Sequence, residues 1–125
     1  MKEKILIVDD EECIRLTFSE FLLGGRYRVE TTASLSGCIK KMQTGSFDLL
    51  FLDIGLGLDN GIEAIEGLKI LQPDCKIVII TGALNSISNA YARRYGAEDY
   101  LVKPIRQQSL LYIAQKVLAH KDTVN

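Results

Sequence analysis

The sequence has few of the residues that build a disulfide framework or a zinc site. Its three cysteines, Cys13, Cys38 and Cys75, are widely spaced, and the single histidine, His120, stands near the end of the 125 residues. No CxxC pair is present, so the ligand spacing typical of a zinc site is missing. We therefore expect the cysteines to be small core residues of a protein in a reducing compartment.

An excess of charge of either sign is also missing. Fifteen Lys and Arg residues against 16 Asp and Glu residues give a net charge of −1, and these charges are interspersed. No basic field therefore favours nucleic acid or an anionic membrane. No apolar run approaches the ~20 residues of a membrane span. The N-terminus also lacks the longer apolar core of a signal peptide. We expect a cytoplasmic protein that binds neither membrane nor nucleic acid directly.

Short apolar runs alternate with amphipathic stretches along the whole chain. The runs predict strands at residues 4–8, 27–32, 47–52, 75–80 and 99–102. The amphipathic stretches predict helices at residues 11–23, 34–42, 62–71, 84–95 and 107–120. Cys38 is expected in the core, and the second helix is expected to direct Leu35, Ile39 and Met42 inward. Such alternation predicts one doubly wound α/β domain, with helices on both faces of a parallel sheet.

Polar residues follow four of the predicted strands. Asp9 and Asp10 follow the first run, Asp53 the third, Thr81 the fourth and Lys103 the fifth. The carboxyl ends of parallel strands meet at one edge of a sheet, where such sheets place ligands. We therefore expect three carboxylates, a hydroxyl and an ammonium group to lie together there.

This set of groups suits a divalent cation and a phosphoryl group. Carboxylates that lie close together raise one another's pKa unless a cation compensates, and Mg²⁺ (or Mn²⁺) prefers such oxygen ligands. The backbone carbonyl of Gly55 can add a further ligand. A carboxylate flanked by Mg²⁺ and an ammonium group is a competent nucleophile toward phosphorus. Asp53 is the best candidate, and Lys103 and Thr81 would contact the phosphoryl oxygens.

Taken together, these residues resemble the receiver domains of two-component response regulators, which are CheY-like. The resemblance covers residues 5 to about 118, and residues 121–125 would be a C-terminal tail or the start of a linker after a receiver domain at 1–120. It depends on the acidic pair Asp9-Asp10, Asp53, Gly61, the run Thr81-Gly82-Ala83, and the run from Gly96 to Pro104 that contains Lys103.

The resemblance implies a flavodoxin-like (βα)5 fold with strand order 2-1-3-4-5. It implies that Asp53 accepts a phosphoryl group from a phosphohistidine on a sensor histidine kinase or a histidine phosphotransfer protein. Asp10, Asp53 and the Gly55 carbonyl would bind Mg²⁺ directly, and Asp9 would bind it through water. Such a domain is not an enzyme beyond its own phosphorylation and dephosphorylation.

The resemblance also implies a conformational switch. Thr81 would move toward the phosphoryl group, and the Tyr100 ring would turn into the space that it leaves. The surface of the fourth helix, fifth strand and fifth helix would then bind an output protein or a C-terminal effector domain, and a weak homodimer on phosphorylation is compatible with it. The Lys103–Pro104 peptide would be cis. Candidate surface residues are Tyr91, Arg94, Tyr100 and Arg106.

The chain departs from the family near the phosphoacceptor. Gly57 stands where the family usually has proline, so we expect a more mobile loop. Gly55 and Ala83 offer little side chain over the phosphoryl group. We therefore expect the lifetime of the phosphate to be set largely by the geometry of water.

Two other interpretations remain open at this point. The glycines at 55, 57 and 61 resemble a dinucleotide-binding loop, although the spacing GxGxxxG is one residue too long and follows the third strand. The alternative function is a Mg²⁺-dependent phosphatase or hydrolase with Asp9 as the nucleophile. Such enzymes need an aspartate two residues after the first, where this chain has Glu11, and they need a cap or insertion to bind substrate.

Overall fold

Five parallel strands form a sheet in the order β2-β1-β3-β4-β5. The strands are β1 (Lys4–Val8), β2 (Arg28–Thr32), β3 (Leu49–Asp53), β4 (Lys76–Thr81) and β5 (Asp99–Val102). The computed structural model describes residues 2–55, 61–82 and 93–119. Its strand order and parallel direction confirm the predicted doubly wound α/β fold.

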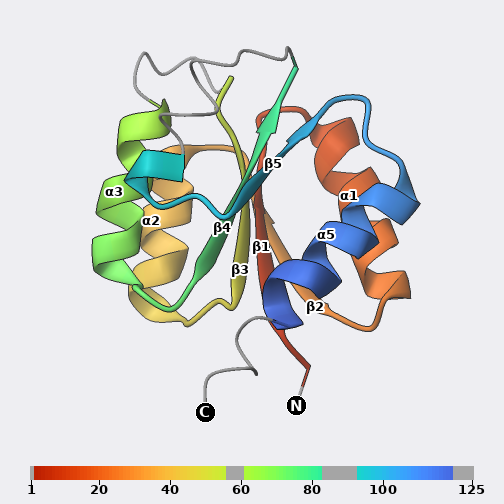
Figure 1. Cartoon of the computed structure of the whole chain (residues 1–125), viewed down its shortest axis with the longest axis horizontal. Helices are drawn as coiled ribbons and strands as arrows, with labels where there is room; N and C mark the ends of the chain where they lie inside the picture. The colour runs from red at the N-terminus through yellow and green to blue at the C-terminus, as the bar shows by residue number, and fades with distance from the viewer. Residues whose placement is uncertain (1, 56–60, 83–92, 120–125) are drawn as a thin grey trace.

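Helices cover both faces of this sheet. The helices with described bounds are α1 (Glu12–Gly24), α2 (Leu35–Thr44), α3 (Gly61–Leu71) and α5 (Gln107–Ala119). Figure 1 shows α2 and α3 on one face and α1 and α5 on the other. The predicted helix at 84–95 lies outside the described residues, except for residues 93–95, which are helical. Among the described residues, no helix has the length and apolar character needed to cross a membrane.

The central strands are buried on both sides, which explains their continuous apolar sequence. In β1, Ile5 and Ile7 pack with α1 and α5, whereas Leu6 and Val8 pack with α2 and α3. Successive side chains of a strand point to opposite faces, so each strand contributes to two separate cores. All five residues of β3 are buried. A rigid strand therefore ends at Asp53.

Local contacts determine where α2 begins. The Ser34 side chain caps the helix by accepting a hydrogen bond from the Gly37 backbone N–H at 3.1 Å. A Cβ atom at position 37 would clash with Thr32 Oγ1, so glycine allows this first turn to pack against the end of β2.

Two predictions of core positions were wrong. Cys38 and Cys75 are buried, but Cys13 is exposed on α1. Burial raises the pKa of the Cys38 thiol to about 12, which keeps it protonated. Ile39 was predicted to point inward, but 37% of it is exposed. Cys38 and Met42, one turn apart, face the sheet, and Ile39 is rotated toward α3.

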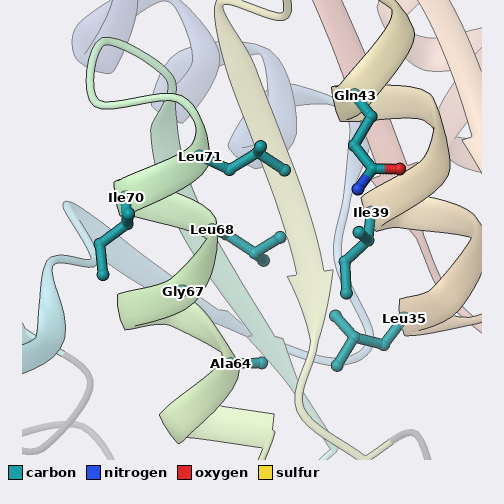
Figure 2. A pocket seen from close by; sticks show the side chains of 8 residues that line it. All are labelled: Leu35, Ile39, Gln43, Ala64, Gly67, Leu68, Ile70 and Leu71. Carbon is teal, nitrogen blue, oxygen red and sulfur yellow. The ribbon is translucent and has the colours of Figure 1, made fainter.

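Ile39 borders a hollow between α2 and α3. Figure 2 shows Leu35 and Ile39 of α2 pointing toward Leu68 and Leu71 of α3. The hollow has a volume of about 370 Å³ and is lined almost entirely by apolar side chains, together with the glutamine at position 43. It lies on the face of the molecule that α2 and α3 cover.

Candidate functional site

The carboxyl ends of β1 and β3 bring three carboxylates together. The two strands are paired up to Val8 and Leu52, and the next residues along each are Asp9 and Asp53. One carboxylate oxygen from each of Asp9, Asp10 and Asp53 lies within 4.8 Å of the others. The three carboxylates therefore lie together, as their positions at the strand ends predicted.

Asp9 is the most enclosed member of the cluster, with no exposed surface. Its backbone N–H donates to the carbonyl of Thr32 at 3.2 Å, and its Oδ1 accepts from the backbone N–H of Glu11 at 2.9 Å. Its Oδ2 lies 3.0 Å from Lys103 Nζ. The direction of that contact is not that of a hydrogen bond, so this buried oxygen keeps unused acceptor capacity.

Asp53 is held by two donors. Its Oδ1 accepts from the backbone N–H of Gly55 at 2.8 Å, and its Oδ2 accepts from Lys103 Nζ at 3.1 Å. Burial raises the pKa of Asp53 and outweighs the opposing effect of these donors, and the charge of Asp9 raises it further. The Gly55 contact keeps the backbone of that residue beside the Asp53 carboxylate.

Lys103 contacts three carboxylates at once. Besides Asp9 and Asp53, its Nζ lies 3.3 Å from Glu11 Oε1. Burial lowers the pKa of this ammonium group, but its contacts with the Asp9 and Asp53 carboxylates outweigh burial and raise it overall. The backbone N–H of Lys103 donates to the Thr81 carbonyl at 2.8 Å. The Lys103–Pro104 peptide is cis, the isomer that the resemblance implies.

The strand register brings Thr81 to the same edge. Ile80 pairs with Asp53, so Thr81 extends one residue beyond the phosphoacceptor candidate, and it pairs with Val102. Tyr100 is half-buried and packs against the core on the α2–α3 side.

The other predicted site and surface residues are only partly described. Arg94 and Arg106 are exposed. Gly57, Ala83, Tyr91 and His120 lie outside the described residues.

The sequence interpretation missed the role of Glu11 beside Lys103. Glu11 is the N-cap residue of α1, yet its side chain makes no capping hydrogen bond. Ser, Thr, Asp and Asn are preferred at that position. A glutamate there was the one signal in the sequence that pointed to another use of its side chain.

The donor set of this edge fits a hard divalent cation. The cluster offers carboxylate oxygens, including the exposed Asp10 and the buried Asp9 Oδ2, which has no hydrogen bond within the described part of the chain. Such oxygens are the ligands that Mg²⁺ prefers. Lys103 brings one positive charge to the three carboxylates, so a cation there would neutralise the remaining negative charge.

Comparison with known proteins identifies the family. Residues 5–115 match the sequence profile of the response regulator receiver domain. The chain belongs to this family. A receiver domain is a regulatory domain of two-component phosphorelay signalling, so the resemblance found in the sequence is confirmed.

Relatives and solved structures agree with this receiver-domain assignment. The chain is 39% identical over 116 residues to the alginate biosynthesis transcriptional regulatory protein AlgB of Pseudomonas aeruginosa, covering 92% of this chain and 26% of AlgB. A CheY-like receiver domain protein from Methanospirillum hungatei has a TM-score of 0.92 at 28% identity, with 98% of both chains covered. The chain therefore spans about a quarter of the length of AlgB.

One solved structure carries a modified aspartate. A response regulator from Burkholderia pseudomallei, described with a phosphorylated aspartic acid, a calcium ion and citrate, has a TM-score of 0.85 at 28% identity. The match covers 97% of this chain and 71% of that protein.

Proposed function

We propose that this receiver domain accepts a phosphoryl group on Asp53 from a phosphohistidine of a sensor histidine kinase or a histidine phosphotransfer protein. The observation that carries the proposal is the position of the Asp53 carboxylate. It accepts from the ammonium group of Lys103 at 3.1 Å and belongs to a cluster of three carboxylates that suits a divalent cation. Phosphoryl transfer depends mainly on such positioning and charge neutralisation.

The proposed step exchanges one bond to phosphorus for another. A carboxylate oxygen of Asp53 forms a bond to phosphorus while the bond between phosphorus and the donor imidazole nitrogen breaks. The electron pair of that bond returns to the imidazole, which keeps it as a lone pair or takes up a proton. Water later attacks the aspartyl phosphate, which restores the carboxylate and releases inorganic phosphate.

The residues of this chain have separate roles in the proposed site. Asp10, Asp53 and the Gly55 carbonyl would hold Mg²⁺ directly, and Asp9 would hold it through water. When bound, the cation would neutralise charge on the phosphoryl oxygens. Lys103 would pair with a phosphoryl oxygen, and the Thr81 hydroxyl would donate a hydrogen bond to another.

The Burkholderia response regulator supports this assignment by analogy. That protein was solved with both a phosphorylated aspartate and a divalent calcium ion, at 28% identity to this chain. The carboxylate cluster of this chain combines an aspartate at a strand end with oxygen ligands suited to a divalent cation. The same pairing of chemistries is what we propose for Asp53.

The signal would leave the site through Thr81 and Tyr100. Movement of Thr81 toward the phosphoryl group would let the half-buried Tyr100 ring turn inward. This would change the surface made by the fourth helix, β5 and α5. Asp99 of β5 couples these segments, because its carboxylate lies 3.4 Å from Arg93 Nη2 and 3.7 Å from Lys116 Nζ of α5.

That surface is the proposed site for an output protein or a C-terminal effector domain. AlgB is named a transcriptional regulatory protein, and the chain covers 26% of it. By analogy, the remainder of such a regulator would carry the output.

Acyl-phosphate labelling of variants tests the proposal against the hydrolase alternative. Purified protein is incubated with Mg²⁺ and a small phosphodonor such as acetyl phosphate, and bound phosphate is measured. We expect labelling of the wild type and none of Asp53→Asn. Asp9→Asn should label more slowly but still label. Turnover of a small phosphoester that survives Asp53→Asn and is lost in Asp9→Asn would instead support the hydrolase.

A further inference from the structure

The side chain of Glu11 is placed at the rim of the site. Its backbone N–H donates to the buried Asp9 Oδ1 at 2.9 Å, which fixes the start of α1 against the acidic cluster. Its carboxylate does not cap the helix and lies 3.3 Å from Lys103 Nζ, in a residue 92 positions away. The side chain of Glu11 is 61% exposed, whereas that of Lys103 is 17% exposed.

The ammonium group of Lys103 and a divalent cation require the same carboxylates. Lys103 Nζ contacts Asp9 at 3.0 Å and Asp53 at 3.1 Å, and both aspartates belong to the candidate metal cluster. A lysine has three N–H donors and no acceptor, so each needs an oxygen partner. Entry of a cation would weaken the hold of Asp9 and Asp53 on the ammonium group, since two like charges would share them.

Among the described residues, Glu11 is the one carboxylate in contact with Lys103 that stands outside the metal cluster. The cluster consists of Asp9, Asp10 and Asp53. Glu11 therefore keeps its negative charge available to Lys103 after the cluster binds a cation. Its position at the rim would hold the ammonium group close to Asp53 while leaving space for the cation.

We propose that Glu11 is a positioning residue that holds the Lys103 ammonium group at the rim of the site when a divalent cation occupies the acidic cluster. The inference depends on the cation binding in the proposed function. It predicts that Glu11 favours cation binding through Lys103, although Glu11 is not itself a metal ligand. Without Glu11, the ammonium group would stay on Asp9 and Asp53 and would compete more strongly with the cation.

Direct measurement of Mn²⁺ affinity tests this role. Free Mn²⁺ is counted by electron paramagnetic resonance in titrations of the wild type, Glu11→Gln, Glu11→Asp and Glu12→Gln. Glu11→Gln should weaken binding about two- to fivefold, the range of an exposed carboxylate–ammonium contact. Glu11→Asp should recover part of the loss. Among the described residues, the carboxylates in contact with Lys103 are those of Asp9, Glu11 and Asp53. Glu12→Gln removes the same charge from the same turn of α1, and a change below about twofold is expected from distance and screening.

The Lys103→Met background separates positioning from a general effect of charge. In that background, Glu11→Gln should change Mn²⁺ affinity no more than Glu12→Gln does. An effect of equal size with and without Lys103 would overturn the proposal, because Glu11 would then act on the cation itself. Unfolding of each variant in urea, without metal, identifies any loss of affinity that comes from a damaged fold.

The nitrogen-15 signal of the Lys103 ammonium group gives a second test that needs no double variant. In the Mg²⁺-loaded wild type, the ammonium protons should stay protected from exchange with water, and Glu11→Gln should lose this protection. Equal protection in both proteins would contradict the proposal. If the wild type does not bind Mn²⁺, the metal site of the proposed function is refuted. If the wild type and Glu11→Gln bind Mn²⁺ with equal affinity, only the role of Glu11 is refuted.

Discussion

Replacement of Lys103 by methionine should destabilise the metal-free protein by about 3 kcal/mol, because it removes one partner of a buried ion pair. The ammonium group contacts Asp9 at 3.0 Å and Asp53 at 3.1 Å. The two carboxylate side chains are 0% and 6% exposed, so solvent screens these contacts little. Methionine has a similar length and keeps the apolar packing, which leaves the lost charge as the main change. Urea denaturation without divalent cations measures the difference.

Lys41→Met is the matched control for this experiment. Lys41 Nζ lies 3.0 Å from Glu30 Oε1, but both side chains are 37% exposed. A pair screened by solvent at this distance contributes less than about 1 kcal/mol. The cost of Lys41→Met should therefore be a small fraction of the cost of Lys103→Met, although the two contacts have nearly the same length.

Magnesium should reduce the cost of Lys103→Met. A cation at ten times its dissociation constant adds about 1.4 kcal/mol to the free energy of unfolding. The variant should gain more than the wild type at the same Mg²⁺ concentration, because the ammonium group no longer competes for Asp9 and Asp53. A cost of Lys103→Met that is the same with and without Mg²⁺, or one no larger than that of Lys41→Met, would refute this reasoning.

Three further predictions concern the fold, pH and phosphate lifetime. Gly67→Ala should raise the free energy of unfolding by about 0.5–1 kcal/mol, because a Cβ at this α3 position meets no atom of the described residues within 4 Å. Gly37→Ala should lower it by about 1–3 kcal/mol through overpacking, and urea denaturation compares the two. Burial raises the pKa of Asp53, so the folded state binds its proton more tightly. The contribution of Asp53 to stability without metal should therefore be fully present below its unfolded pKa and be lost as pH rises through its folded pKa, and pH-dependent unfolding of Asp53→Asn should lack this loss. Gly55→Asn should change the rate of acyl-phosphate hydrolysis, because a Cβ there would lie 3.2 Å from Asp53 Oδ1; an unchanged rate would contradict a role of this position in water access.

The sheet and the edge that carries the site could be predicted because the apolar pattern of a strand is set by nearby sequence. Continuous apolar runs such as Ile5–Val8 are required when both faces of a parallel strand are covered. The same logic put Asp9 and Asp53 side by side, since the strands that precede them are paired in register. The position of Thr81 follows from the same alignment.

Predictions of helix faces were less accurate, because the apolar stripe of a helix is wider than the part that contacts the sheet. The period of α2 allowed both Cys38 and Ile39 on the apolar side, but only Cys38 faces the sheet, and Ile39 borders the hollow beside α3. Cys13 was expected in the core only because free cysteines are usually buried, and its exposure on α1 is an exception to that tendency. Which part of a stripe meets the sheet depends on how the helix rotates during packing, and this is a tertiary property.

Contacts between distant side chains were the least accessible to prediction. Lys103 was placed at the right edge, but its contact with Glu11 joins residues 92 apart and depends on the reach of both side chains. The unused acceptor capacity of Asp9 Oδ2 likewise follows from contact direction. Such details depend on the folded positions of both side chains.

The measurement that tests the central claim most directly is the location of the phosphoryl group on the wild-type chain. Protein treated with a small phosphodonor and Mg²⁺ is reduced with borohydride, which converts an aspartyl phosphate to homoserine, and the peptides are sequenced by mass spectrometry. We predict conversion at Asp53 alone, and none when the divalent cation is removed by chelation. Conversion at Asp9 or Asp10 in place of Asp53, or full conversion without a divalent cation, would contradict the account.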